Sequence, residues 1–121
     1  MSNVEATLRE FGQSMSIEEV AFNEHGVAHF TIDQIGELYI ETCPSGKYIV
    51  YIVREHGHLD RDQLVKALEL CHLEERNPMP VNAALRGENE ICFGFRLAEE
   101  DFIIPNIEEG IAMLNALHDR I

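Results

Sequence analysis

Residues 81–97, V-N-A-A-L-R-G-E-N-E-I-C-F-G-F-R-L, contain the clearest folding signal in the chain. Residues 81–85 form a short extended run. In residues 91–97, every second residue is a large apolar one, namely Ile91, Phe93, Phe95 and Leu97. Because successive side chains of a strand point to opposite faces, the second run has one apolar face. Residues 86–89, R-G-E-N, are rich in turn formers. The stretch predicts a β-hairpin of two antiparallel strands.

A helix is predicted upstream of this hairpin, from about residue 60 to residue 71. Asp60 and Gln63 have the spacing of a capping box, and Leu59 can pack against Leu64 as a hydrophobic staple. One side of the helix carries Leu64, Ala67, Leu68 and Cys71, and Val65 and Leu70 widen the apolar surface. A surface helix needs a single apolar stripe. The excess therefore indicates a second buried surface on this helix.

The region before this helix is typical of strands separated by turns. Residues 27–32 and 37–41 have extended patterns, and residues 20–22 are either a further strand or irregular chain. Turn residues follow at 23–26, 33–36 and 44–46. Residues 48–53, Y-I-V-Y-I-V, are apolar at every position. Such a run predicts a central strand that is covered on both faces.

Helices are predicted at both ends of the chain. The first has an apolar stripe at helical spacing, made by Val4, Leu8, Phe11 and Met15. The last begins near Pro105, and Glu108 and Glu109 are expected at the positive end of its dipole. Its inward stripe comprises Ile107, Ile111, Leu114, Leu117 and Ile121. The predicted order is α-β-β-β-(β)-α-β-β-α. We expect residues 1–121 to form one α+β domain with a twisted, antiparallel β-sheet and three helices.

The charge of the chain restricts its partners. The 121 residues include 9 Lys and Arg but 22 Asp and Glu, which gives a formal net charge of −13 at pH 7. Bringing nucleic acid or an anionic membrane surface close would cost electrostatic work, so neither is predicted as a partner. Met1 is followed by no basic segment, and no apolar stretch is long enough to cross a bilayer. We expect a cytoplasmic protein.

The histidines and cysteines do not form a recognisable site. His56 and His58 are close in sequence, but His25 and His29 are not at a metal-ligand spacing from them. The three cysteines, Cys43, Cys71 and Cys92, lack a CxxC spacing and lie in apolar patterns typical of structural thiols. No phosphate-binding glycine motif is present. We therefore predict no catalytic residue, metal or cofactor. The alternative is a small α+β enzyme or ligand-binding domain that uses His56, His58 or His29 in a pocket.

The whole chain resembles the class I chaperones of type III secretion, the family that includes the Tir chaperone. The resemblance rests on the helix with Leu8 and Phe11, the strand meander, the capped middle helix, the hairpin of residues 81–97 and the closing helix. Small size and acidity are also shared. The resemblance implies a bacterial cytoplasmic homodimer without enzymatic activity. It also implies that the protein binds the N-terminal region of a secreted effector in a non-globular state, which keeps the effector soluble and ready for secretion.

The resemblance also implies two sets of site residues. The effector-binding residues would lie on the first helix and the early strands: Leu8, Phe11, Met15, Val20, Phe22, Val27 and Phe30. Phe30 is equally consistent with a position in the core. The dimer interface would lie on the middle helix and the strand after it: Leu64, Val65, Leu68, Cys71, Val81, Ala83 and Leu85.

Overall fold

The computed structural model describes residues 3–17, 20–72 and 75–121, which contain three α-helices and five strands. In chain order the elements are α1 (Asn3–Ser14), β1 (Val27–Ile32), β2 (Gly36–Thr42), β3 (Lys47–Glu55), α2 (Arg61–Leu70), β4 (Asn82–Arg86), β5 (Glu90–Ala98), the 3₁₀ turn η2 (Glu99–Asp101) and α3 (Ile104–Asp119). This order confirms the α+β prediction in its version with one strand fewer.

Residues 20–22 connect α1 to β1 as irregular chain and do not form a strand. Val20 is buried and packs against Gly12 of α1, where any larger residue would collide with it. The connection is therefore held by side-chain packing against α1, and within the described residues it has no neighbouring strand.

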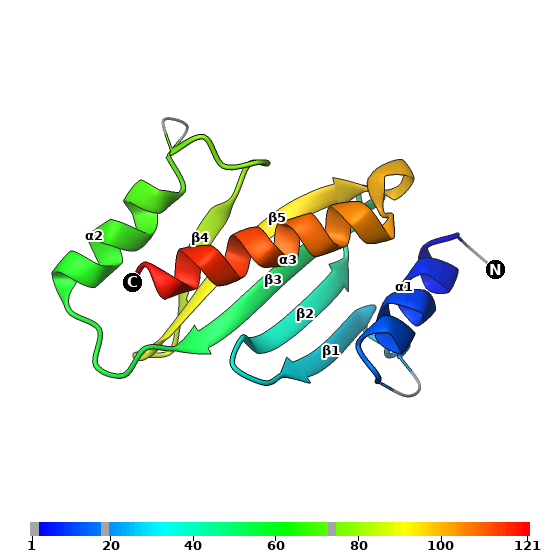
Figure 1. Cartoon of the computed structure of the whole chain (residues 1–121), viewed down its shortest axis with the longest axis horizontal. Coiled ribbons are helices and arrows are strands. Elements are labelled where there is room, and N and C mark those ends of the chain that lie inside the picture. Colours follow the sequence, from blue (N-terminus) through cyan, green and yellow to red (C-terminus); the bar gives the residue numbers. More distant parts are fainter. Residues whose placement is uncertain (1–2, 18–19, 73–74) are drawn as a thin grey trace.

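The strands form one antiparallel sheet in the order β1-β2-β3-β5-β4, shown in Figure 1. The predicted hairpin of β4 and β5 is confirmed, with Arg86 opposite Glu90 next to its turn. Gly87 in that turn has a φ of 62°, a conformation that glycine adopts without strain. The register places Leu38 opposite Ile52, so apolar side chains line up across the sheet. As predicted, β3 lies in the middle of the sheet.

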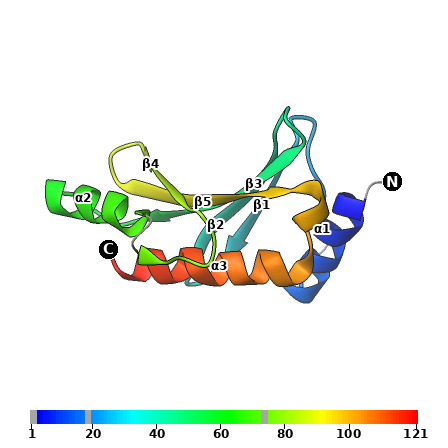
Figure 2. The same cartoon turned by 90° about the horizontal axis from the view of Figure 1, so that it is seen from above.

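Helices α1 and α3 pack on the same face of this sheet (Figure 2). Phe11 of α1 meets Phe30 of β1 edge to face, with 6.0 Å between the ring centres. Gly110 of α3 lies against the ring of Phe95 in β5, and a side chain at this glycine would overlap that ring. The core therefore forms between these two helices and alternate residues of the strands.

The opposite face of the sheet corrects one prediction. Ile49, Tyr51 and Val53 point away from the side where α3 packs, because they alternate with the buried Val50 and Ile52. None of the described helices packs on this face of the sheet (Figure 2). The expectation that β3 is covered on both sides was therefore wrong for Ile49 and Tyr51. On this sheet surface, which we call the open face, Ile49 and Tyr51 are partly exposed, whereas Val53 is buried.

Helix α2 begins as the sequence predicts. The backbone N–H of Gln63 donates to the Asp60 carboxylate at 2.9 Å, and the backbone N–H of Asp60 donates to the Gln63 side chain at 3.0 Å. This capping box confirms the start of the helix, and Cys71 caps its end. The helix lies beside β4, at the end of the molecule farthest from α1 (Figure 1). Within α2 only Ala67 and Leu70 are buried.

Helix α3 begins at Ile104, so Pro105 lies in its first turn as predicted. Glu108 and Glu109 come after that turn, which contains no acidic residue, and their predicted placement at the positive end of the helix dipole was wrong. The predicted inward stripe is buried from Ile107 to Leu117, and Gly110, Met113 and His118 widen it. Among the described helices, none combines the length and the apolar character needed to span a bilayer.

Candidate interaction surfaces

The first candidate surface lies between α2 and β4, and we call it the α2–β4 surface. Its centre is a hollow of about 230 Å³ lined by Leu64, Ala67, Leu68, Ala83, Ala84, Leu85 and Ile91. Leu68 and Leu85 are 67% and 52% exposed, which is unusual for leucine side chains that lie close together. An apolar surface of this kind on a small acidic protein is typical of a protein contact.

The seven residues predicted for a dimer interface differ in exposure. Val65, Leu68 and Leu85 are exposed, and Leu64, Cys71 and Ala83 are partly exposed. Val81 is buried and belongs to the core of its own chain. The structure thus brings six of the seven to the surface near α2 and β4. The sequence indicates more apolar residues on α2 than one buried stripe needs. The structure shows that Leu64, Val65 and Leu68 are among those left exposed or partly exposed.

A second candidate surface is the groove between α1 and α3. It has a volume of about 300 Å³ and is lined by Phe11, Met15, Ile35, Glu108, Ile111, Ala112 and Asn115. Met15 is 37% exposed at the end of this groove, whereas Phe11 forms its floor and is buried. The lining is mainly apolar, so the α1–α3 groove suits an aliphatic side chain of a partner.

A third hollow, of about 250 Å³, lies on the other side of α1. It is lined by Glu5, Leu8, Arg9, Val20, Ala21 and Phe22. The ring of Phe22 is partly exposed and lies 6.1 Å from that of Tyr48, measured between ring centres. Glu5 and Arg9 make this α1 hollow more polar than the α1–α3 groove.

The residues predicted for effector binding fall into two groups. Met15, Phe22 and Val27 reach the surface. Leu8, Phe11, Val20 and Phe30 are buried, although all but Phe30 form the floor of a hollow. Sequence reasoning could not separate the two groups, because Phe11 and Met15 belong to one helical stripe.

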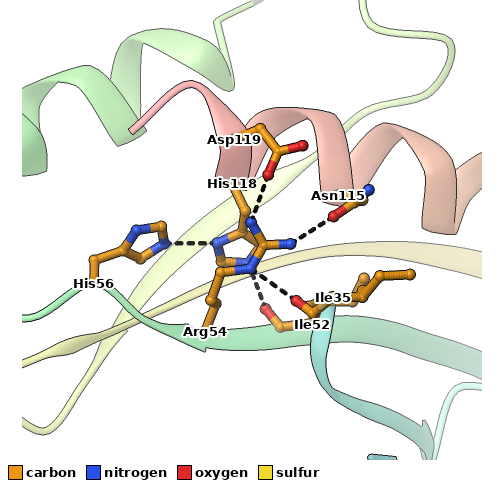
Figure 3. A network of polar contacts seen from close by, with 7 residues as sticks. All are labelled: Ile35, Ile52, Arg54, His56, Asn115, His118 and Asp119. Carbon is orange, nitrogen blue, oxygen red and sulfur yellow. Dashed lines mark hydrogen bonds and ion pairs between the residues drawn. The ribbon is translucent and has the colours of Figure 1, made fainter. Parts of the chain in front are cut away.

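A polar network, drawn in Figure 3, joins the end of β3 to the end of α3. The Arg54 guanidinium donates to the Ile35 carbonyl oxygen and to Asp119, both at 2.8 Å, and also to the Asn115 side chain. The Arg54 side chain is only 18% exposed, whereas Asp119 is 64% exposed, so the ion pair remains in contact with water on the Asp119 side. The network fixes the last turns of α3 against the sheet.

His118 lies beside this network and is only 1% exposed. Its Nε2 is 2.9 Å from the Ile52 carbonyl oxygen, which can only accept, so Nε2 carries the proton. Nδ1 then accepts from Nε2 of His56, 2.9 Å away. Burial lowers the pKa of His118 to about 4 and also lowers the pKa of His56. Both rings are therefore neutral at pH 7. The position of His118 four residues after Leu114 could have indicated its burial.

The histidines of the alternative reading do not meet in one pocket. His56 bonds to His118, His58 is exposed, and His29 lies on β1 with its ring bonded to Glu37. None of the hollows described above is lined by a histidine. In the described part of the chain, no three His, Cys, Asp or Glu side chains are grouped closely enough to hold a metal ion.

Two of the three cysteines also differ from catalytic nucleophiles. Burial raises the pKa of the Cys71 and Cys92 thiols, which keeps them protonated at neutral pH. A catalytic thiol needs the opposite shift. All three cysteines are free and partly exposed. Among the described residues, the apolar surfaces are therefore stronger candidates for a functional site than the histidines or the cysteines.

Comparison with solved structures shows the same fold in several proteins. A chain from the Yersinia pestis type III secretion chaperone SycH in complex with a stable fragment of YscM2 has a TM-score of 0.70 and 19% identity, over 98% of this chain and 96% of that one. A chain of the HopA1–SchA chaperone–effector complex has a TM-score of 0.69 and 17% identity, over 94% and 89% of the two chains. A chain of the ExsC–ExsE complex has a TM-score of 0.76 and 12% identity, with the same coverage.

The sequence itself identifies the family. No curated protein matches it. The family model described as type III secretory system chaperone SycN, however, matches residues 3–121. That match extends from the start of α1 to the second residue after α3, so it includes every described element of the fold and each surface described above. The chain therefore belongs to the SycN family of type III secretory system chaperones.

Proposed function

We propose that this chaperone binds the N-terminal region of a secreted effector in a non-globular state, in the bacterial cytoplasm and as a homodimer. The family match over residues 3–121 carries the proposal. The fold it shares with SycH and SchA supports it, since those structures contain a YscM2 fragment and an effector respectively. We propose no catalytic role.

Strand β1 offers a backbone template for an extended client, because it is an outer strand of the sheet. The Gly26 carbonyl oxygen accepts from the backbone N–H of Thr42 in β2, whereas the Val27 carbonyl oxygen points away from β2 and accepts from the backbone N–H of Asn23. Since backbone groups alternate along an antiparallel strand, those of His29 and Thr31 also point away from β2. A client segment could add there as a further strand.

The two hollows beside α1 would hold apolar side chains of the same client. The α1–α3 groove and the α1 hollow lie on either side of one helix, and each has a volume of about 250 to 300 Å³. A leucine or isoleucine that is fully buried in such a site contributes roughly 1.5 to 3 kcal/mol. Backbone pairing at β1 would then give affinity with little sequence preference, and the hollows would select aliphatic residues.

The α2–β4 surface supports the homodimer. Leu68 and Leu85 expose most of their side chains to solvent in a single chain. A twofold dimer places the same patch of both copies together, so these exposed leucines would cover one another. The surface lies at the opposite end of the molecule from α1 (Figure 1), which leaves the client hollows open in the dimer.

The direct test is co-expression with N-terminal fragments of proteins encoded beside this gene, followed by purification of complexes. We expect one fragment to co-purify and to remain sensitive to protease, as an extended client would. Phe22→Glu places a charge in the α1 hollow and should weaken the complex at least tenfold. Ile103→Glu is the matched control, because Ile103 is 47% exposed and outside the proposed surfaces. Retention of the client by the Phe22 variant would contradict this use of the hollow.

A further inference from the structure

Three rings are stacked on the open face of the sheet. His29, Tyr39 and Tyr51 are direct neighbours across β1, β2 and β3. The ring centres of His29 and Tyr39 are 4.4 Å apart, and those of Tyr39 and Tyr51 are 5.0 Å apart. The planes differ by 7° and 10°. These separations are close to the spacing of neighbouring strands, so each strand contributes one ring to a continuous stack.

The stack stops at β5, where the register places Gly94 opposite Tyr51. Asn82 of β4 is the next residue in the same row. Gly94 has no positive φ and so does not need to be glycine for its backbone conformation. A Cβ there would instead approach Cβ of Tyr51 to 2.9 Å. A fourth ring would have to come from position 94 of β5. Because this residue is glycine, the row has no side chain next to Tyr51.

A hollow of about 290 Å³ occupies this position. Its walls include Tyr51, Ile49 and Cys92, all of which are partly buried, and its floor is the backbone at Gly94. The distance between β3 and β4 is two strand spacings, or roughly 9.6 Å, which leaves room for one planar group between Tyr51 and Asn82. We call this site the open-face hollow.

The charges around the open-face hollow indicate the kind of group it accepts. Glu41 and Arg96 both line it, so their opposite charges leave no net preference for a cation or an anion. Burial, together with a hydrogen bond to Glu41, raises the pKa of Tyr51, so this phenol remains neutral. A guanidinium already contacts the middle ring of the stack, because Arg86 of β4 lies 5.5 Å from the ring centre of Tyr39 and donates to its hydroxyl at 3.2 Å. A neutral, apolar and planar group suits the hollow best.

We propose that the open-face hollow binds an aromatic side chain of the client polypeptide, which becomes the fourth ring of the stack. The identity of the polypeptide rests on the proposed function, whereas the chemistry of the site does not. Aromatic pairs contribute beyond their buried area, so replacing this client residue by leucine should weaken binding about tenfold.

The site can be tested without knowing the client, by following backbone amide NMR signals during titration with N-acetyl-tryptophan amide. We expect saturable shifts around Gly94 and Tyr51, and none with N-acetyl-leucine amide or N-acetyl-arginine amide. Tyr51→Ala should abolish the saturable shifts, because it removes the ring against which the added group would stack. His29→Leu is the matched control, since it removes a ring two positions away and should leave the shifts unchanged.

Three results would overturn the proposal. The first is the absence of saturable shifts, and the second is equal binding of the leucine or arginine amide. The third is a tenfold or greater loss of dimerisation in the Tyr51→Ala variant, measured by light scattering, because Tyr51 lines the open-face hollow and not the α2–β4 hollow, so a second copy would then fill the open-face hollow.

Co-purification separates this proposal from the proposed function. If a client is bound but no aromatic residue of it can be replaced with a loss of affinity, the open-face hollow fails and the chaperone function remains. If no client binds to the wild-type chain, the proposed function fails, and the amide titration still decides whether the hollow accepts an aromatic ring.

Discussion

Lowering the pH from 7 to 5 should destabilise the folded chain through His118. The folded state holds this ring neutral with a pKa of about 4, against 6.5 for an ordinary histidine. At pH 5 the unfolded chain therefore binds a proton that the folded chain does not, so stability falls as the pH falls from 6.5 toward 4. The loss amounts to roughly 2 kcal/mol at pH 5 and roughly 3 kcal/mol below pH 4. His56, whose pKa is also lowered, adds to the loss.

The assay is urea unfolding followed by circular dichroism at pH 7 and pH 5, at constant ionic strength. His118→Gln keeps an amide N–H that can donate to the Ile52 carbonyl oxygen but cannot titrate. The variant should therefore lose roughly 2 kcal/mol less than the wild type between the two pH values. His58→Gln, at an exposed position, should behave like the wild type.

Equal losses in the wild type and in His118→Gln would refute this reasoning. If the variant does not fold, an NMR titration of the wild-type histidine rings gives the answer directly. The ring of His118 should remain neutral at pH 5, and protonation of that ring above pH 6 would show that its burial does not oppose the charge.

Three further changes have defined outcomes. Asp60→Ala removes the capping box at α2 and should cost about 1 kcal/mol in urea unfolding; an unchanged midpoint would mean that the cap does not contribute. Gly110→Ala forces a methyl group into the ring of Phe95 and should cost about 1 to 3 kcal/mol, whereas a neutral result would show that α3 can shift away. Leu68→Asp puts a charge on the α2–β4 surface and should convert the proposed dimer of two 13.8 kDa chains into monomers, as measured by light scattering. A dimer that persists would place the interface elsewhere.

Local features of the fold could be predicted from the sequence. The capping box at Asp60 and the hairpin of β4 and β5 depend on residues a few positions apart, so their patterns are decisive on their own. The place of β5 between β3 and β4 is different, because the pairing of Val50 with Phe95 joins residues far apart in the chain. Alternation shows that a strand has an apolar face, but it does not show which strand lies beside it.

The candidate surfaces could be predicted only in part. Residue type selects Leu8, Phe11 and Met15 as one apolar stripe, but the packing of α3 decides which of them is covered. The same is true of the open face, because Tyr39 and Tyr51 become neighbours only once the register of β2 and β3 is fixed. A polar residue such as His118 inside an apolar stripe is the kind of local signal that sequence reasoning can still use.

The ring stack also gives this chaperone a built-in optical reporter. The chain has three tyrosines and no tryptophan, and two of the tyrosines, Tyr39 and Tyr51, belong to the stack. Its ultraviolet emission therefore comes largely from the open face. Any tryptophan in a client can be excited selectively at wavelengths where tyrosine does not absorb. Energy transfer from the stacked phenols to such an indole would then report binding in solution without a dye or a label.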